Sequence, residues 1–324
     1  MLLKNKHIQS VYATFFRKFP PHKFFIERFT LSDGDFLEPY WYKKPTSNKP
    51  IVILFHGLGG SYQSPYIRGL MQELDRLGFN SVVMHFRTSS GKMNLKPIAY
   101  HSGKTDDAKE FIQSVKQRFP SSKLFGVGFS LGANMLLKLS GEEKENSPFS
   151  ACVAVSPPMQ LDIGADKINS GFSKVYQKHL LKTLNSLLEQ KYDTHDMHSI
   201  INFKRKNVKK ISTFWEFDEV YTAKIHGFKS AKDYYLKSSS KQYLKYIKTP
   251  TLIIYALDDP FMTPAILPKK DEISEFVELE IHKHGGHVGF VNGSLFNPVY
   301  YLEKKIPDFF KNFIMSPFVK STFK

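Results

Sequence analysis

The residue best suited to chemistry in this sequence is a serine in the stretch 128–132, which reads Gly-Phe-Ser-Leu-Gly. In this G-x-S-x-G pattern, a sharp turn between a strand and a helix makes the serine protrude at the carboxyl edge of a sheet. An apolar run at 124–127 precedes the motif and helical spacing follows over 133–139, so the required setting is present. Glycine-rich turns contain serine by chance, but in this setting the pattern predicts that Ser130 is a nucleophile.

A nucleophilic serine needs a base and a carboxylate that orients the base, and their order along the chain is serine, acid, histidine. Asp258 and Asp259 follow one expected strand (251–256), and His282, His284 and His287 follow the next (277–281). His287 is the predicted base because the glycines before it free its loop to present the imidazole. Either aspartate could be the acid, since Asp-Asp-Pro also simply begins turns. The histidines could by composition bind a metal, but no matching cluster accompanies them, so we expect no metal.

The charge that develops when a serine attacks a carbonyl is stabilised by two backbone N–H donors. One is expected from the residue after the nucleophile, Leu131. The other is expected from the glycine-rich stretch 56–60, His-Gly-Leu-Gly-Gly, which follows an earlier apolar run. We predict Leu58 as that second donor, so that the two form an oxyanion hole.

The elements that must position these residues alternate between apolar runs and helical spacing. Apolar runs typical of strands covered on both faces occur at 51–55, 81–86, 124–127, 151–155 and 251–256, and the stretch 277–281 is expected to be a further strand. Helical spacing occurs at 66–77, 133–139 and 299–313. A further helix is expected to begin after Thr105, which we predict as its N-terminal cap. This alternation predicts an α/β protein with a mostly parallel central sheet flanked by helices. An Asp-Gly turn at 32–35 predicts a hairpin before the sheet.

The alternation stops after 155 and resumes at Pro250, with only helical spacing between. We interpret about 157–248 as a helical lid inserted into a single domain that spans 1–324. The aromatic residues at 214–217 are expected to form the core of this lid. The stretch 100–102, Tyr-His-Ser, is expected to pack a loop rather than to line a pocket.

Composition excludes several classes of protein. Of 324 residues, 41% are hydrophobic and 23% charged, which excludes a disordered or collagenous chain. The single cysteine excludes a disulfide framework and a cysteine-ligated metal, and we expect it to be a buried thiol. No stretch approaches the roughly 18 apolar residues of a spanning helix. The first twenty residues lack a signal-peptide core, so we expect a soluble, cytoplasmic protein.

The net charge of +16 comes mostly from lysines spread singly or in pairs along the chain. Such a distribution is typical of a basic surface and allows peripheral contact with an anionic membrane. The sequence contains no nucleic-acid recognition module, so we expect no nucleic-acid partner. The sequence does not indicate an oligomeric state.

These residues resemble those of the α/β-hydrolases, and more narrowly the YheT-like branch of abhydrolase-domain proteins, over about residues 8–313. Beyond the motifs above, the similar stretches are Met84-His85-Phe86-Arg87, Tyr100-His101-Ser102-Gly103, Phe217-Asp218, His226-Gly227-Phe228 and Asp233-Tyr234-Tyr235. The resemblance implies an α/β-hydrolase fold and a cofactor-free Ser-Asp-His esterase or lipase-like hydrolase. It also implies that Asp259, which precedes Pro-Phe, is the acid, with Asp258 as the alternative.

One stretch departs from the family pattern. After Arg87 the family usually carries Gly-Cys-x-Gly-Glu-Pro-Asn, whereas residues 88–94 here read Thr-Ser-Ser-Gly-Lys-Met-Asn. Because this loop follows a strand near the expected pocket, we hypothesise that Lys92 suits an anionic substrate.

The sequence thus predicts a serine hydrolase that cleaves a small-molecule or lipid-derived carboxylic ester through an acyl-enzyme. Two alternatives use the same residues differently. An acyltransferase would pass the acyl group to an alcohol, and a non-catalytic protein would use the scaffold and its basic surface to bind anionic partners.

Overall fold

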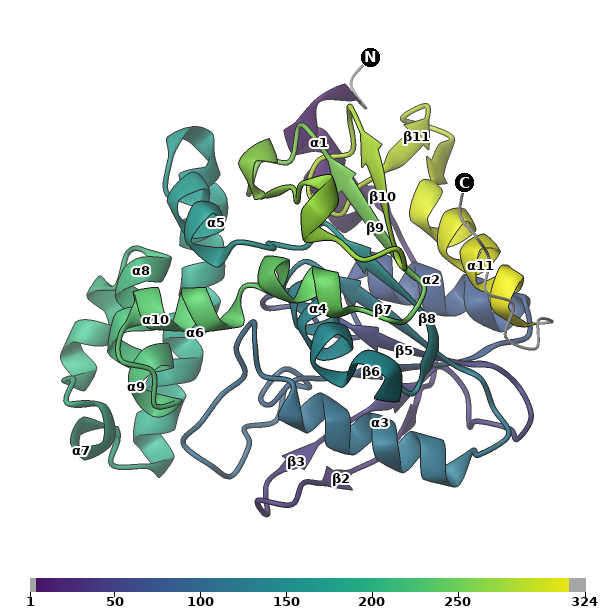
Figure 1. The fold of residues 1–324 in the computed structure, drawn as a ribbon. Coiled ribbons are helices and arrows are strands. Elements are labelled where there is room, and N and C mark those ends of the chain that lie inside the picture. Colours follow the sequence, from purple (N-terminus) through teal and green to yellow (C-terminus); the bar gives the residue numbers. More distant parts are fainter. Residues whose placement is uncertain (1–3, 315–324) are drawn as a thin grey trace.

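The computed structural model describes residues 4–314 and shows an eight-stranded sheet with helices on both faces (Figure 1). In spatial order the strands are β1 (Phe25–Ile26), β4 (Tyr40–Trp41), β6 (Asn80–Met84), β5 (Ile51–Phe55), β7 (Leu124–Phe129), β8 (Phe149–Val155), β9 (Thr251–Ala256) and β10 (Val277–His282). The six strands from β6 to β10 pair in parallel, and β1 and β4 add antiparallel pairs at one edge. The predicted α/β fold with a mostly parallel sheet is therefore confirmed.

Strand β5, in the middle of the sheet, is apolar throughout because both of its faces are covered. Along β5, Val52 and Leu54 pack into one core with α2 (Pro65–Arg76) and α11 (Tyr301–Ile314). Its other residues, Ile51, Ile53 and Phe55, pack into a second core with α3 (Asp106–Arg118) and α4 (Leu131–Glu143). Side chains alternate between the faces of a strand, so one apolar run fills two cores.

Of the two local predictions, the hairpin at 32–35 is correct and the side-chain cap at Thr105 is not. The Asp-Gly turn joins the hairpin strands β2 (Phe29–Thr30) and β3 (Phe36–Leu37), with Gly34 at φ 84°. Thr105 precedes α3 but does not cap it through its side chain. Its hydroxyl donates instead to Glu142 of α4 at 2.7 Å, so tertiary contact outcompetes the local capping bond.

Residues 156–250, between β8 and β9, are all described and contain helices but no strand. The α-helices are α5 (Leu161–Ile168), α6 (Lys174–Thr194), α7 (Met197–Ile201), α8 (Phe214–Phe217), α9 (Ala223–Ile225) and α10 (Ala231–Ser238). Most of them form a group beside the sheet in Figure 1. We call residues 157–248 the cap. The cap has its own core, which includes Leu181, Leu188 and Met197.

A buried lysine joins the cap to the loop after β6. Lys191 of α6 is 1% exposed, and its ammonium group donates to Asn94 Oδ1 and to the carbonyl of Lys96. Burial lowers the pKa of Lys191 to about 8 against the attraction of Asp35. Asn94 in turn donates to Asp35 Oδ2 at 2.5 Å. The loop 88–99 is thereby fixed between the cap and the hairpin.

A buried ion-pair cluster centred on Arg87 holds the hairpin, the end of β6 and α3 together. Arg87 donates to Asp107 through Nε (2.7 Å) and Nη2 (2.8 Å), and through Nη1 to Asp33 and Asp35, both at 2.8 Å. The Arg87 side chain is 3% exposed and that of Asp35 is fully buried. Burial opposes the charge, but the bonds and charges of the aspartates outweigh it and raise the pKa of Arg87. Removing the cation takes the ion-pair partner from the fully buried Asp35, whereas Asp107 still has Lys104 at 3.3 Å.

We therefore expect Arg87→Leu to lower the free energy of unfolding by about 3–5 kcal/mol, measured by urea denaturation. Arg76→Leu is the matched control, because Arg76 pairs with Glu73 on the surface and its side chain is 69% exposed. The control should change stability far less. Equal losses in the two variants would show that the Arg87 cluster has no special role.

Candidate active site

Ser130 occupies a strained turn between β7 and α4. It is not a glycine, yet its φ is 52° and its ψ is −117°, outside the regions that L residues favour. A Cβ added to Gly128 would lie 2.5 Å from Ala133 Cα, and one added to Gly132 would lie 2.4 Å from the Phe55 carbonyl oxygen. Both positions therefore require glycine, because the first turn of α4 lies directly against the strands.

The structure brings Ser130, His287 and Asp259 together from the ends of β7, β10 and β9. His287 Nε2 lies 2.9 Å from Ser130 Oγ, and His287 Nδ1 lies 2.8 Å from Asp259 Oδ2. The Asp259 side chain is fully buried, and its other oxygen accepts from the Phe261 N–H at 2.8 Å. The imidazole thus lies between a hydroxyl on one side and a buried carboxylate on the other.

The alternative acid, Asp258, has different partners. Its Oδ1 accepts from the N–H groups of Gly285 and Gly286, each at 3.0 Å, and its Oδ2 lies 3.2 Å from His284 Nδ1. Asp258 therefore braces the backbone of the loop that carries His287, whereas Asp259 contacts the His287 ring. The adjacent aspartates have separate structural roles.

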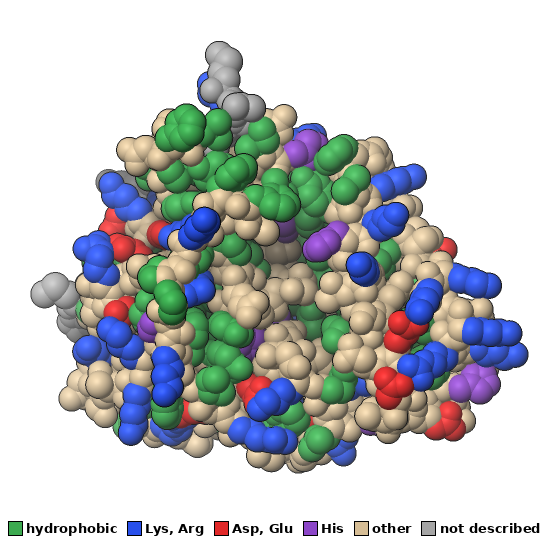
Figure 2. Space-filling model, turned by 180° about the vertical axis from the view of Figure 1, so that it is seen from behind, with side chains coloured by type: hydrophobic (Ala, Val, Ile, Leu, Met, Phe, Trp, Pro, Cys, Tyr) green, Lys and Arg blue, Asp and Glu red, His purple; other side chains and the backbone are tan. Residues whose placement is uncertain are grey.

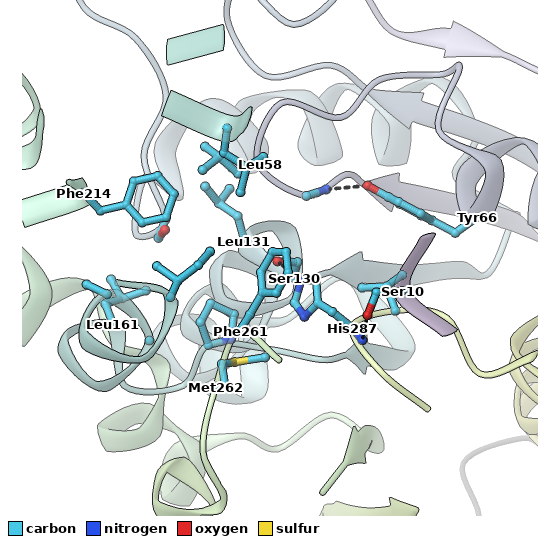
Figure 3. Close-up of a pocket in the computed structure, with 18 of the residues that line it drawn as sticks. Ser10, Leu58, Tyr66, Ser130, Leu131, Leu161, Phe214, Phe261, Met262 and His287 are labelled. Atoms are coloured by element: carbon cyan, nitrogen blue, oxygen red, sulfur yellow. Dashed lines mark hydrogen bonds between the residues drawn. The ribbon is translucent and has the colours of Figure 1, made fainter. Parts of the chain in front are cut away.

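Helix α1 (Lys6–Phe16) supports the His287 loop from outside the sheet, which the sequence analysis did not foresee. The His287 N–H donates to Ser10 Oγ at 2.8 Å, and Ser10 itself donates to the Lys6 carbonyl. On its other side the imidazole stacks on the Phe261 ring, with centroids 4.0 Å apart and planes at 8°. Figure 3 shows Ser10 and Phe261 beside His287. No motif in 1–20 indicates this contact, because only folding brings α1 to the loop.

The glycine-rich loop after β5 is also tightly held. The Gly57 N–H donates to the Tyr66 hydroxyl at 3.1 Å (Figure 3), and the Gly59 N–H donates to the Tyr100 hydroxyl at 3.1 Å. Within residues 4–314, the N–H groups of Leu58 and Leu131 have no protein acceptor. Both leucines line the same cavity as Ser130. Two backbone donors in this cavity wall are thus available to a ligand.

His56, at the start of that loop, bonds to backbone groups on both sides of its ring. Its Nδ1 bonds to the Gly57 carbonyl at 2.7 Å, and its Nε2 accepts from the Phe86 N–H at 3.3 Å. Burial and the neighbouring His85 lower the pKa of His56 to about 3. The ring is therefore neutral and links the glycine-rich loop to the end of β6.

A cavity of about 320 Å³ extends from Ser130 and His287 into the cap. Its cap side is lined by apolar and aromatic residues, including Leu161, Phe214 and Phe217. Figure 3 shows Leu161 and Phe214 across the cavity from Leu58. The prediction that the aromatics at 214–217 belong to the cap core is therefore incomplete, because Phe214 and Phe217 also face the cavity.

Two expectations about neighbouring loops need correction. Residues 100–102 line the cavity rather than only packing a loop, because the Tyr100 hydroxyl reaches the Gly59 N–H. Lys92 does not line the cavity: its ammonium group pairs with Glu38 at 2.7 Å. This pairing removes the basis for the hypothesis that Lys92 contacts an anionic substrate.

Asp218 in the cap is a carboxylate in the cavity wall to which the sequence analysis gave no role. It accepts from the Thr222 hydroxyl at 2.6 Å and from the Tyr235 hydroxyl at 2.7 Å. Burial raises the pKa of Asp218 to about 6, against the effect of these two bonds. The cap side of the cavity therefore contains a hydrogen-bonded polar group, formed by Asp218, Thr222 and Tyr235, beside its apolar residues.

The remaining reactive groups have ordinary structural positions. Among the described residues, no group of three or more His, Cys, Asp and Glu side chains is placed to hold a metal. His282 pairs with Glu280 at 2.7 Å. Cys152 is buried, as predicted, and burial raises the pKa of its thiol to about 12.

No helix within residues 4–314 has the length and apolar character to cross a membrane.

Three features define the α/β-hydrolase class: the parallel sheet, the strained turn at Ser130 between β7 and α4, and the helical segment between β8 and β9. A family model described as the alpha/beta hydrolase fold matches residues 50–294, and the chain belongs to this family. The chain is 40% identical over 316 residues to YheT of Escherichia coli (strain K12), whose name assigns it to the esterases. That match covers 96% of this chain and 91% of that protein.

Two further similarities fit this assignment. The chain is 34% identical over 270 residues to medium-chain fatty acid ethyl ester synthase/esterase 2 of Saccharomyces cerevisiae, covering 75% of this chain and 58% of that protein. The solved Pyrococcus furiosus esterase Pf2001 superimposes with a TM-score of 0.59 at 18% identity, over 90% of this chain and 91% of that one, which is a likeness of fold. The family is thus one of esterase- and lipase-like hydrolases.

The bracing role of Asp258 predicts a stability effect. Asp258→Ala leaves two loop N–H donors without their acceptor, so we expect it to lower the free energy of unfolding by about 1–3 kcal/mol. Asp258→Asn keeps an amide oxygen at the acceptor position and should lose less. Urea denaturation of both variants measures the difference, and the reverse order would contradict the assignment.

Proposed function

We propose that this protein is a serine hydrolase that cleaves carboxylic esters, with Ser130 as nucleophile, His287 as base and Asp259 as the acid that orients it. The observation that carries the proposal is the hydrogen-bonded series from Ser130 Oγ through the imidazole to a fully buried carboxylate. Such a series activates a hydroxyl that is otherwise a weak nucleophile at neutral pH.

In the proposed first step, His287 Nε2 takes the proton of Ser130 as Oγ attacks the ester carbonyl carbon. Asp259 stabilises the imidazolium and fixes the tautomer in which Nδ1 carries a proton. The Leu58 and Leu131 N–H groups donate to the oxyanion. The imidazolium then returns its proton to the leaving alcohol, and an acyl-enzyme remains.

In the second step, His287 removes a proton from water, whose oxygen attacks the acyl carbonyl carbon. The bond from that carbon to Ser130 Oγ then breaks, the imidazolium returns the proton to Oγ, and the acid is released. Both steps use only side chains and backbone of this chain, with no cofactor. The Phe261 ring against the imidazole and the Ser10 bond to its backbone keep His287 aligned through both steps.

The apolar side of the cavity supports a lipophilic acyl or alcohol group as part of the substrate. Leu161, Phe214 and Phe217 offer burial to a chain that begins at the carbonyl held near Ser130. We propose that the cap acts as the lid over this substrate.

A second candidate function is acyl transfer to an alcohol. It uses the same acyl-enzyme with an alcohol in place of water. The Saccharomyces relative supports it, because its name describes both an ester synthase and an esterase. The apolar cavity supports it too, because apolar walls favour an alcohol over water near Ser130. The non-catalytic alternative has no comparable support.

The proposal predicts labelling of the native protein by a fluorophosphonate, measured by intact-mass spectrometry. Ser130→Ala should abolish labelling, and His287→Ala and Asp259→Asn should slow turnover of a short-chain p-nitrophenyl ester by about 10⁴-fold or more. Asp258→Asn is the matched control and should retain most of the activity. Wild-type protein that is folded yet unlabelled would overturn the proposal.

Product analysis separates hydrolysis from acyl transfer. With an ester substrate and added ethanol, a hydrolase should give almost only the free acid, because water attacks the acyl-enzyme faster. An ethyl ester formed in excess of the ethanol-to-water ratio would identify the acyltransferase instead. Chromatographic quantification of acid and ethyl ester provides the measurement, with Ser130→Ala as the blank.

A further inference from the structure

Large apolar side chains are exposed together where α1 ends and a C-terminal hairpin turns. The hairpin consists of β11 (Val291–Gly293) and β12 (Pro298–Tyr300). The exposed residues are Phe15 (73%), Phe16 (68%), Leu295 (36%), Phe296 (100%) and Val299 (51%), and we call them the apolar crown. In Figure 1, α1 and β11 lie at the same end of the molecule. A group of exposed large hydrophobics marks a contact surface more often than an isolated one does.

The two parts of the crown are fixed to each other although they are far apart in sequence. Gln9 of α1 donates to the Val291 carbonyl at 2.8 Å and accepts from the Val291 N–H at 2.7 Å. The Tyr12 hydroxyl donates to the Leu295 carbonyl, and the Tyr12 and Phe16 rings lie 5.1 Å apart. The crown is therefore one surface, in which hydrogen bonds hold α1 and the hairpin together.

The segments that carry the crown contain basic residues and no acid. Lys4, Lys6, Arg17, Lys18 and Lys23 lie before the first acidic residue of the chain, at position 27. The stretch 281–302 also contains no Asp or Glu. Arg17 is paired with Glu303, but Lys4, Lys18 and Lys23 are exposed. The charge that these two segments carry is therefore complementary to an anionic surface.

The crown also borders the cavity that contains Ser130. This cavity is lined by Ala13 and Thr14 of α1, by Arg17 just after that helix and by Tyr300 of β12, which are sequence neighbours of crown residues. Figure 2 shows a face that is hollowed near its centre, with hydrophobic side chains gathered above the hollow, towards the end that carries α1. A molecule held at the crown is thus close to an entrance of the cavity.

We propose that the apolar crown docks this protein on an anionic lipid bilayer and that the ester substrate enters the cavity from the bilayer beside α1. Exposed phenylalanines insert into the region between headgroups and acyl chains, while the lysines attract anionic headgroups. A protein partner would explain the apolar residues, but it gives no reason for a substrate cavity that opens between the docking elements. The entry of substrate rests on the proposed ester hydrolysis, whereas the docking does not.

The test is co-sedimentation of the full chain with unilamellar vesicles of phosphatidylcholine alone or mixed with phosphatidylserine. We expect binding to the mixed vesicles that weakens at high salt. The variant Phe15→Ser/Phe16→Ser/Phe296→Ser should bind on the order of a hundredfold more weakly, since each exposed phenylalanine loses its burial in lipid. Lys4→Glu/Lys18→Glu should lose the preference for anionic vesicles.

The matched control is Ile200→Ser/Leu236→Ser, which removes exposed apolar residues (44% and 68%) from the cap instead. It should bind like the wild type. The triple variant should hydrolyse a soluble short-chain ester at the wild-type rate but a vesicle-borne ester more slowly. Full hydrolysis of the soluble ester without vesicle binding would overturn docking while leaving the proposed function intact. A concentration-dependent dimer that the triple variant abolishes would assign the crown to a second copy and overturn the proposal.

Discussion

The close approach of α4 to the strands is the constraint on which the site depends. The first turn of α4 lies so near β5 and β7 that only glycine fits at 128 and 132, and the chain between them must turn sharply. Ser130 consequently takes a positive φ, and its hydroxyl projects beyond the strand end towards His287. Strain at this residue persists because the packed cores on both sides of the sheet over-determine the turn.

The loops around that serine are held by bonds that leave few groups free. His56 and His85, which burial keeps neutral, fasten the ends of β5 and β6 through backbone contacts. Asp258 occupies the N–H groups before His287, which leaves the neighbouring Asp259 to meet the ring. A preorganised arrangement of this kind costs little reorganisation when charge develops, which is the main requirement for acyl transfer.

The cap and the N-terminal helix complete the cavity from opposite sides. The cap is tied to the sheet by the buried Lys191, and α1 is tied to the His287 loop by Ser10 and to the β11–β12 hairpin by Gln9. Both elements supply cavity walls, so the shape of the ligand space depends on contacts between segments that are distant in the chain. In our proposals the cap side accommodates the lipophilic group and the α1 side faces the bilayer.

The sequence alone determined the fold class and the order of the chemical groups, because apolar runs, helical spacing and glycine-flanked turns are local patterns. It placed Ser130 between a strand and a helix, and it placed His287 and two aspartates after later strands of the same sheet. The residues themselves left two aspartates open and the family resemblance favoured Asp259. The tertiary structure places Asp259 against His287, since adjacent residues at a strand end point in different directions. It also decided that Lys92 is neutralised by Glu38, that Tyr100 reaches the glycine-rich loop and that α1 braces the His287 loop. Each of these contacts joins residues at least 40 positions apart, and no local pattern encodes such a pairing.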